Sequence, residues 1–326
     1  MKQIRENHIW TTRSIGALML AALLAVCTTA DARRHGSNDR CTPCQTVAKL
    51  ALRAELTEAR GDYLLAIAKA NTISDQEERA EAYEDAKEEL FEATSEFYDI
   101  YLARIRFCKA LGEKYYEPDI DPEDFLSPEE IESDPNPYLP LVPGTVRTYE
   151  GDTEDGLETI VVEVTDETRE ILDVECVVVR DTVWIDGELV EDTRDWFTQD
   201  VDGNVWYFGE IAVNYEDGEI ADVEGSWEAG EDGAKPGIVM PADPQVGDVY
   251  RQEFLLGEAE DGGAVVALGQ SVSVPYGDFT NCLQTADFTP LEPDAMEYKF
   301  YEPGVGLVLE INPESDERVE LISVEN

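Results

Sequence analysis

Histidine is almost absent from this chain of 326 residues. His8 and His35 are the only two, and His8 lies in a segment that is typical of a cleaved export signal. Ser-His-Asp triads, Cys-His pairs and His-rich zinc sites all need a histidine held inside the fold. A G-x-S-x-G motif, a P-loop and a G-x-G-x-x-G motif that opens a helix are also missing. These absences argue against the common hydrolase and nucleotide-binding classes, and we expect a protein that is not an enzyme.

Basic residues are scarce as well. The chain has 24 Lys and Arg against 73 Asp and Glu, a formal net charge of −49 at pH 7. Nucleic-acid binding depends on Lys and Arg, so nucleic acid is excluded as a partner. The acidic residues are spread along the whole chain, which favours a role in solubility over a single ion site.

Long apolar runs are confined to the N-terminus. Basic residues there precede "IGALMLAALLAV" (15–26) and a small-x-small sequence, "ADA" (30–32). This order predicts a signal peptide at 1–32, because the apolar run is short for a bilayer core of about 30 Å. We therefore expect a secreted or periplasmic protein without a transmembrane span. The alternative is a lipid anchor on Cys27, because "LAVC" resembles a lipobox apart from Val26.

The mature chain divides into three parts after the signal. Residues 33–115 have helical periodicity and predict an antiparallel helical hairpin, with helices at 43–71 and 75–112. A linker rich in proline and acids follows at 116–144, where regular structure is disfavoured. Residues 145–326 contain six Asp-Gly pairs, most of them flanked by β-branched runs, which is typical of hairpins. The fold class is α+β, with an antiparallel meander as a curved half-barrel or a β-sandwich.

Five cysteines remain after removal of the signal, and export permits disulfides. In the helical hairpin, a rise of about 1.5 Å per residue leaves Cys41 and Cys108 offset by about 3 Å along the axis, and Cys44 and Cys108 by about 8 Å. We expect Cys41–Cys108, with Cys44–Cys108 as a close alternative, and Cys176–Cys282 by elimination. "CTPC" (41–44) is also a C-x-x-C at a helix start, but a structural role is favoured over redox exchange.

The stretch "DVDGNVWYFGE" (200–210) has two interpretations. Asp200, Asp202 and Asn204 alternate as in a calcium loop, so calcium is a candidate cofactor. An EF-hand loop counted from Asp200 would need Gly at its sixth position and Glu at its twelfth, where the chain has Val205 and Ile211. A β-hairpin that turns at Asp202-Gly203 fits better.

Aromatic residues lie on both faces of this expected hairpin. They are Trp196, Trp206, Tyr207 and Phe208. A half-exposed sheet alternates more cleanly between apolar and polar residues. Either both faces are covered, for example by the helical hairpin, or one face lines a concavity. In the second case these four residues are candidate ligand-binding residues for a hydrophobic small molecule or lipid.

Several segments carry a resemblance to known proteins. "NPYLPLVPGTVRTYEG" (136–151), "DWFTQDVDGNVWYFGE" (195–210), "GSWEAGEDGAKPGIVMPADPQVGDVYRQEF" (225–254) and "YKFYEPGVGLVLE" (298–310) resemble a family of uncharacterised secreted bacterial proteins. That resemblance covers about residues 136–310 and transfers no catalytic residues. The segment "YEPGVGLV" is also similar to the end of LolA-like periplasmic half-barrels, which hold lipid in an apolar half-barrel.

Together these features predict an exported, non-enzymatic binding or structural protein of the cell envelope, which holds a hydrophobic ligand on an aromatic-lined sheet face. One alternative is a secreted protein that is stabilised by calcium. Another is a hydrolase that uses two carboxylates, since acidic residues are abundant.

Overall fold

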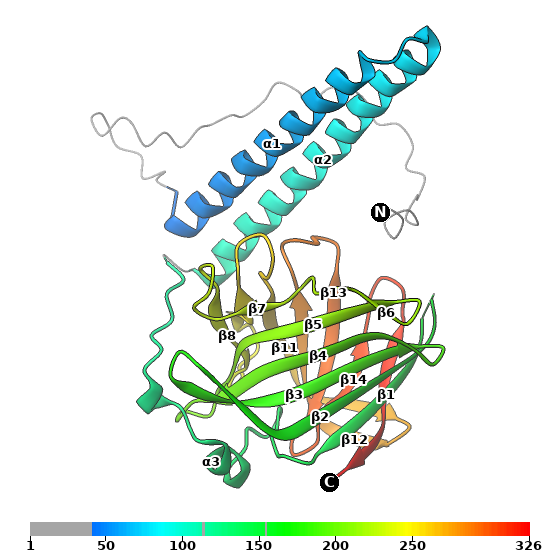
Figure 1. The fold of residues 1–326 in the computed structure, drawn as a ribbon. Coiled ribbons are helices and arrows are strands. Elements are labelled where there is room, and N and C mark those ends of the chain that lie inside the picture. Colours follow the sequence, from blue (N-terminus) through cyan, green and yellow to red (C-terminus); the bar gives the residue numbers. More distant parts are fainter. Residues whose placement is uncertain (1–40, 113–114, 154) are drawn as a thin grey trace, which may run out of the picture. The chain divides into compact units, whose positions relative to one another are not determined.

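The structure is a computed structural model that describes residues 41–112, 115–153 and 155–326. The expected signal peptide at 1–32 and the alternative anchor on Cys27 lie outside the described residues. What is described is an N-terminal helical region followed by a large antiparallel sheet, which confirms the α+β class and the curved sheet (Figure 1).

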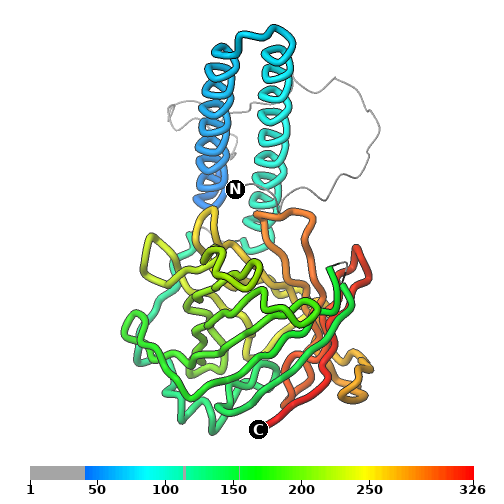
Figure 2. Tube along the Cα trace, turned by 45° about the vertical axis from the view of Figure 1, so that its right-hand side comes forward, coloured from blue at the N-terminus to red at the C-terminus, as the bar shows by residue number. Residues whose placement is uncertain are grey.

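Two long helices, α1 (Pro43–Ala70) and α2 (Gln76–Leu111), lie side by side (Figure 2). Thr42 caps α1 through a capping box with Gln45, and Asp75 caps α2 by accepting two backbone N–H groups. Such caps satisfy N–H groups that have no partner within the helix. Alanines are prominent among the buried residues of both helices, with Ala48, Ala59 and Ala70 in α1 and Ala86 and Ala103 in α2.

A disulfide joins Cys44 to Cys108, with a Cα–Cα distance of 5.8 Å. The expected Cys41–Cys108 bond is therefore wrong, and its close alternative is correct. The physical reason is where the helix starts: Cys41 precedes the cap residue Thr42, whereas Cys44 lies in the first turn of α1. An axial offset alone did not account for which residues face α2.

The last turns of α2 pack against the sheet. The ring of Phe107 meets that of Phe288 edge-to-face at 5.1 Å. A Cβ on Gly262 would lie 2.3 Å from the Phe107 ring, so a side chain at that position would displace it. The guanidinium of Arg104 donates hydrogen bonds to Glu260 and to Glu55, and both Arg104 and Glu260 are buried.

In the described residues the sheet has 15 strands, most of which are labelled in Figure 1. Their bounds are β1 (Val146–Thr153), β2 (Gly156–Ile171), β3 (Val174–Ile185), β4 (Glu188–Gln199), β5 (Val205–Glu216), β6 (Glu219–Asp222), β7 (Trp227–Glu228), β8 (Lys235–Met240), β9 (Val249–Arg251), β10 (Glu253–Phe254), β11 (Gly262–Val274), β12 (Gly277–Phe288), β13 (Met296–Glu302), β14 (Gly306–Ile311) and β15 (Arg318–Glu325).

The sheet consists of two meanders that meet at β1 and β15. Its order is β10-β8-β5-β4-β3-β2-β1-β15-β14-β13-β12-β11-β9, and β6 and β7 also pair with β5. The edge strands β9 and β10 are separated in sequence by Gln252 alone. The short segment 249–254 thus pairs with β11 at one edge and with β8 at the other, which brings the two edges of the curled sheet together.

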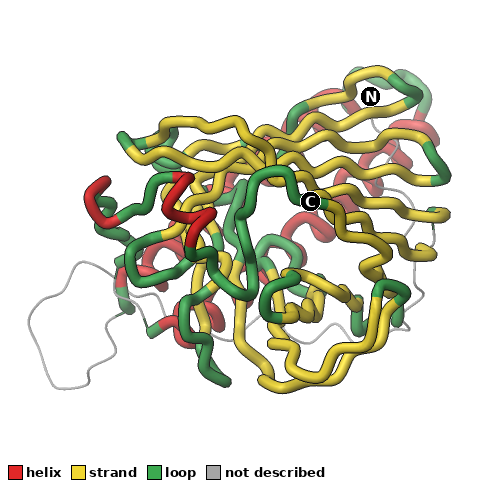
Figure 3. The backbone as a smooth tube through the Cα atoms, turned by 90° about the horizontal axis from the view of Figure 1, so that it is seen from below, coloured by secondary structure: helices red, strands yellow, loops and turns green. Residues whose placement is uncertain are grey.

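The inner face of the curved sheet holds the main hydrophobic core. Residues of β2, β3, β5 and β8 pack there with residues of β11, β12 and β13 from the other meander, as in the contacts among Val164, Val177, Val265 and Leu283. Figure 3 shows the strands on two sides with loops between them. The predicted linker supplies part of this core: it contains η1 (Pro122–Asp124) and α3 (Pro128–Ser133), and Ile131 of α3 is fully buried.

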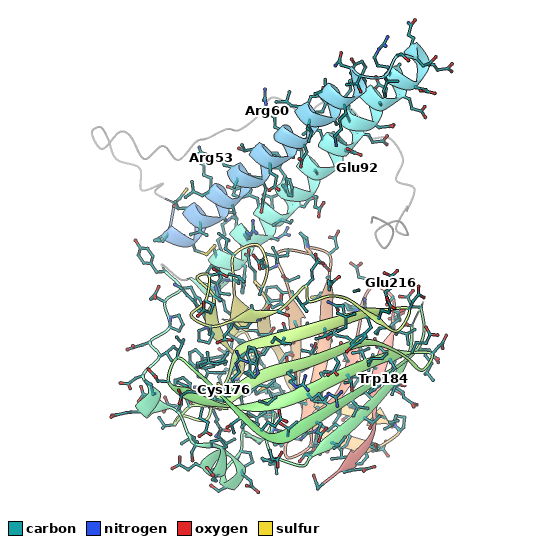
Figure 4. All side chains as sticks on the ribbon, viewed as in Figure 1. Arg53, Arg60, Glu92, Cys176, Trp184 and Glu216 are labelled. Carbon is teal, nitrogen blue, oxygen red and sulfur yellow. A yellow bond between two sulfur atoms is a disulfide. The ribbon has the colours of Figure 1, made fainter. Side chains whose placement is uncertain are left out.

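Cys176 and Cys282 are both free and buried, so the expected disulfide between them is wrong. Cys176 lies on β3 (Figure 4) in a cluster with Trp196 and Phe208, whereas Cys282 lies on β12 in a cluster with Tyr149 and Leu321. Burial raises the pKa of both thiols, to about 12 for Cys282. They behave as small core side chains, and pairing by elimination had no geometric support.

Candidate ligand cavity inside the curved sheet

A cavity of about 350 Å³ lies on the inner face of the sheet, beside the main core. Its apolar wall is formed by Leu139, Leu141, Val162, Val164, Val179, Phe197 and Val239. Its polar wall carries six carboxyl groups, from Asp181, Asp195, Glu210, Glu253, Asp261 and Asp287, together with Arg147, Lys299, Gln252 and the hydroxyls of Tyr207 and Tyr301. A pocket with an apolar wall and a few converging polar groups is the usual form of a small-molecule site.

A β-bulge places the central acidic pair. Trp196 of β4 pairs with Gly209 of β5, but the next β4 residue, Phe197, pairs with Tyr207, so Phe208 is an extra residue on β5. Without the bulge, Tyr207 and Glu210 would point to opposite faces, because side chains alternate along a strand. With it, both side chains line the cavity.

Asp195 and Glu210 lie directly opposite each other on β4 and β5. The hydroxyl of Tyr207 donates a hydrogen bond of 2.6 Å to Asp195 Oδ1. Burial raises the pKa of Asp195 to about 7, with Glu191 adding to the effect and the Tyr207 hydrogen bond opposing it. Burial also raises the pKa of Glu210 to about 8, and the nearby charge of Asp195 contributes. Near neutral pH this pair is therefore poised to gain or lose protons.

Three further carboxyl groups surround this pair. Burial raises the pKa of Asp181 well above its usual value, and the charges of Asp195 and Glu191 add to it. Asp181 Oδ1 is buried and has no hydrogen-bond partner in the protein. Burial likewise raises the pKa of Glu253 and of Asp261. A buried polar atom without a partner costs free energy, so Asp181 marks a place where a ligand would restore a missing contact.

Two cations are also in the cavity wall. Lys299 Nζ lies 3.5 Å from Asp287 Oδ2 and 3.8 Å from Glu310 Oε2. Burial alone would lower the pKa of Lys299, but these carboxylates raise it well above its usual value. Arg147 donates to the backbone carbonyl of Val305 at 2.8 Å, and burial lowers its pKa. Lys299 is thus paired with carboxylates of β12 and β14, and Arg147 is held by the backbone between β13 and β14.

The aromatic candidates from the sequence lie in different places. Tyr207 lines the cavity, and its ring also meets that of Trp227 edge-to-face at 5.3 Å. Trp196 and Phe208 are buried in a cluster on the other face of the sheet, which also contains Trp227. The guanidinium of Arg169 lies 4.1 Å from the Trp196 ring centre, and Phe125 of the linker meets Phe208 at 5.6 Å.

Trp206 also meets the ring of Phe125, at 5.9 Å. Segments of the same chain therefore cover the aromatic outer face that the sequence assigned either to the helices or to a ligand.

The candidate calcium residues form a turn between β4 and β5. The Asp200 carboxylate accepts hydrogen bonds from the backbone N–H groups of Asp202 and Asn204 and from the side chains of Asn204 and Trp206. This confirms the hairpin, although the loop spans five residues and only Gly203 has a positive φ. Among the residues that the structure describes, no group of three or more His, Cys, Asp or Glu side chains is arranged to hold a metal ion.

Sequence reasoning missed the acidic cavity wall. Asp181, Asp195 and Glu210 are three of the many acidic residues for which the composition predicts only a general role in solubility. One signal was present: acidic residues at both odd and even positions of "DTRDWFTQD" (192–200) place a carboxyl group on each face of β4, whichever face is buried. The bulge that aims Glu210 inward left no comparable signal, apart from Gly209 between two bulky residues.

Comparison with known proteins gives little to build on. No protein-family model and no curated protein matches the chain. One solved structure, described as a "putative lipoprotein" from Parabacteroides distasonis ATCC 8503, is similar over 59% of this chain and 100% of its own, with 15% sequence identity and a TM-score of 0.32. A likeness at that score supports no argument about function. In the described part of the chain, neither α1, α2 nor a shorter helix combines the length and apolar character that crossing a membrane requires.

Proposed function

We propose that this chain is an exported, non-enzymatic binding protein that holds a small molecule in the cavity inside its curved sheet. The observation that carries this proposal is the buried Asp181 Oδ1, which has no partner in the protein and lines a cavity of about 350 Å³. Export is supported by the signal-like residues 1–32, and the cell envelope is the compartment that such a signal serves.

The composition of the wall supports a ligand with two different ends. Val162, Val164 and Val179 offer apolar contact on one side, while Asp181 and Asp195 offer hydrogen-bond acceptors on the other. A cavity volume of this size falls within the range of about 300–1,000 Å³ typical of small-molecule sites. The sequence alone predicts a hydrophobic ligand on an aromatic face. The ligand proposed here also has a polar end, because carboxyl groups line the cavity.

Native mass spectrometry tests this proposal most simply. Protein purified from its own exporting host should show the chain mass plus one small molecule, released when the protein is denatured. The variant Val164→Trp, which fills the apolar wall, should lose the added mass, whereas Glu188→Gln, an exposed change on β4, should keep it. The bare chain mass for the wild type, together with no stabilisation by any compound of a small-molecule panel, would refute the proposal.

A carboxylate-based hydrolase is the second candidate, and the facing pair Asp195 and Glu210 favours it. One protonated and one ionised carboxyl group are the requirement for acid–base glycoside hydrolysis, and both pKa values lie near neutrality. Chromogenic glycosides test this candidate. Turnover that is abolished in Asp195→Asn and in Glu210→Gln, but kept in Glu188→Gln, would replace the binding function with an enzymatic one.

A further inference from the structure

We infer that the ligand of this cavity is an organic cation, with its ammonium group held by Asp181, Asp195 and Glu210 and its apolar part held by the valine wall. This inference rests on the proposed function and names the chemical class of the ligand. Four observations lead to it: the charge balance of the cavity wall, the unpartnered carboxyl oxygen, an aromatic pair beside the acids and the apolar wall.

The charge balance favours a positive ligand. Six carboxyl groups and two cations line the cavity, and the cations are already engaged by Asp287, Glu310 and a backbone carbonyl. A carboxylate or phosphate ligand would repel the ionised forms of the remaining acids, whose pKa values burial already raises, whereas a bound ammonium group stabilises those ionised forms at short range. A cation would instead offset the unfavourable burial of several carboxylates in one place.

A carboxyl oxygen without a hydrogen-bond donor lies on the side of the cavity formed by β3, β4 and β5. Asp181 Oδ1 is enclosed and unpartnered, and Asp195 uses Oδ1 to accept from Tyr207. An ammonium group has three donors and no acceptor, so it can satisfy several carboxyl oxygens at once. A carboxylate or ether ligand has no donor to offer them.

An aromatic pair flanks the same carboxyl groups. The rings of Phe197 and Tyr207 are stacked, with centroids 4.6 Å apart, and both side chains line the cavity. An ammonium group over an aromatic face is attracted by the ring quadrupole, and the gain is largest where water is excluded. Carboxylates beside stacked rings form a set that suits an alkyl or aryl ammonium ion better than a strongly hydrated metal ion.

The apolar wall explains why the cation should be organic. Leu139, Val162 and Val179 offer no ligands to an inorganic ion, and the described acids form no metal-binding group of three. Each buried methylene of an alkyl chain contributes about 0.8 kcal/mol to binding. A carbon chain attached to the charged end would therefore gain binding free energy on the apolar side of the cavity.

Three compounds with the same chain length test the inference: n-hexylammonium, n-hexanol and n-hexanoate. Isothermal titration calorimetry near neutral pH should give one molecule of hexylammonium per chain, with an affinity at least tenfold above that of hexanol and no binding of hexanoate. Because the whole protein is a polyanion, the same titration at high salt distinguishes cavity binding from general attraction. Cavity binding should persist, whereas attraction at the surface is screened.

Two variants complete the experiment. Asp181→Asn keeps the shape of the side chain and should weaken hexylammonium binding about tenfold. Glu188→Gln removes an exposed charge on β4 of the same sheet and should leave the affinity unchanged. Circular dichroism of each variant verifies that the fold is kept. Equal affinity for hexanol and hexylammonium, unchanged binding by Asp181→Asn, or no binding of any of the three compounds would overturn the inference. A neutral or anionic molecule found by native mass spectrometry would also overturn it, but would leave the proposed binding function standing.

Discussion

Replacing Asp195 by Asn should make the protein more stable at alkaline pH. The pKa of Asp195 rises from 3.8 to about 7 on folding because the carboxyl group is buried. Because its pKa is raised in the folded state, Asp195 contributes to the free energy of unfolding fully below about pH 4. This contribution is lost as the pH rises through 7. At about 1.4 kcal/mol per pKa unit, the loss of stability has an upper limit of about 4 kcal/mol. We expect about 2–4 kcal/mol, because protonation of Glu210 and water in the cavity reduce the cost of ionising Asp195.

The assay is urea unfolding of wild type and Asp195→Asn at about pH 5 and about pH 9. Asn still accepts the hydrogen bond from Tyr207 but carries no charge, so the gain should grow from about 1 kcal/mol at pH 5 to about 2–4 kcal/mol at pH 9. Asp192 is the matched control: the hydrogen bonds from Arg180 lower its pKa, so Asp192→Asn should cost stability at pH 9, by about 0.5 kcal/mol at this partly exposed site. If the unfolding free energies of wild type and Asp195→Asn changed in parallel with pH, Asp195 would not have the raised pKa in the folded state.

Three further predictions concern the rest of the fold. Gly262→Ala should lower the unfolding free energy by about 1–3 kcal/mol, because its Cβ would meet the Phe107 ring. Gly61→Ala, which has open space around it in α1, should raise the unfolding free energy by about 0.5–1 kcal/mol. Urea unfolding measures both changes. Cys44→Ser should cost about 2–4 kcal/mol under oxidising conditions and nothing after reduction, and equal stability in both conditions would contradict the disulfide. Calcium should raise the melting temperature no more than magnesium does, because the Asp200 carboxylate is occupied within its turn; a calcium-specific rise that Asp200→Asn removes would show that this interpretation is wrong.

Local turn chemistry was readable from the sequence where Asp-Gly joins two strands. Asp186-Gly187 and Asp217-Gly218 both have positive φ at both residues, as a two-residue hairpin turn requires. Asp261-Gly262 has neither, because that pair opens β11 against Phe107. The turn from β2 to β3 uses Leu172 and Asp173, whose positive φ values carry no glycine signal at all. A tertiary contact accounts for Asp261-Gly262, whereas the structure offers no comparable explanation for the turn at Leu172 and Asp173.

The placement of the candidate site could not be read in the same way. The hairpin of β4 and β5 and its aromatic residues were predicted, but the bulge beside Phe208 shifts which residues share a face. Trp196 and Phe208 then lie under Phe125 and Trp227, and the acids that flank them in sequence line the cavity. A one-residue shift exchanges the two faces of a strand. The alternation of residues along the sequence therefore assigns the wrong face to every residue beyond a bulge.

Binding of an organic cation in the cavity is the central claim about this protein. A crystal structure of the protein with n-hexylammonium tests this directly. We expect one molecule inside the curved sheet, with its nitrogen within hydrogen-bonding distance of Asp181 and Asp195 and its chain along Val162 and Val179. Hexylammonium found only on the outer, acidic surface, with Asp181 still unpartnered, would contradict it.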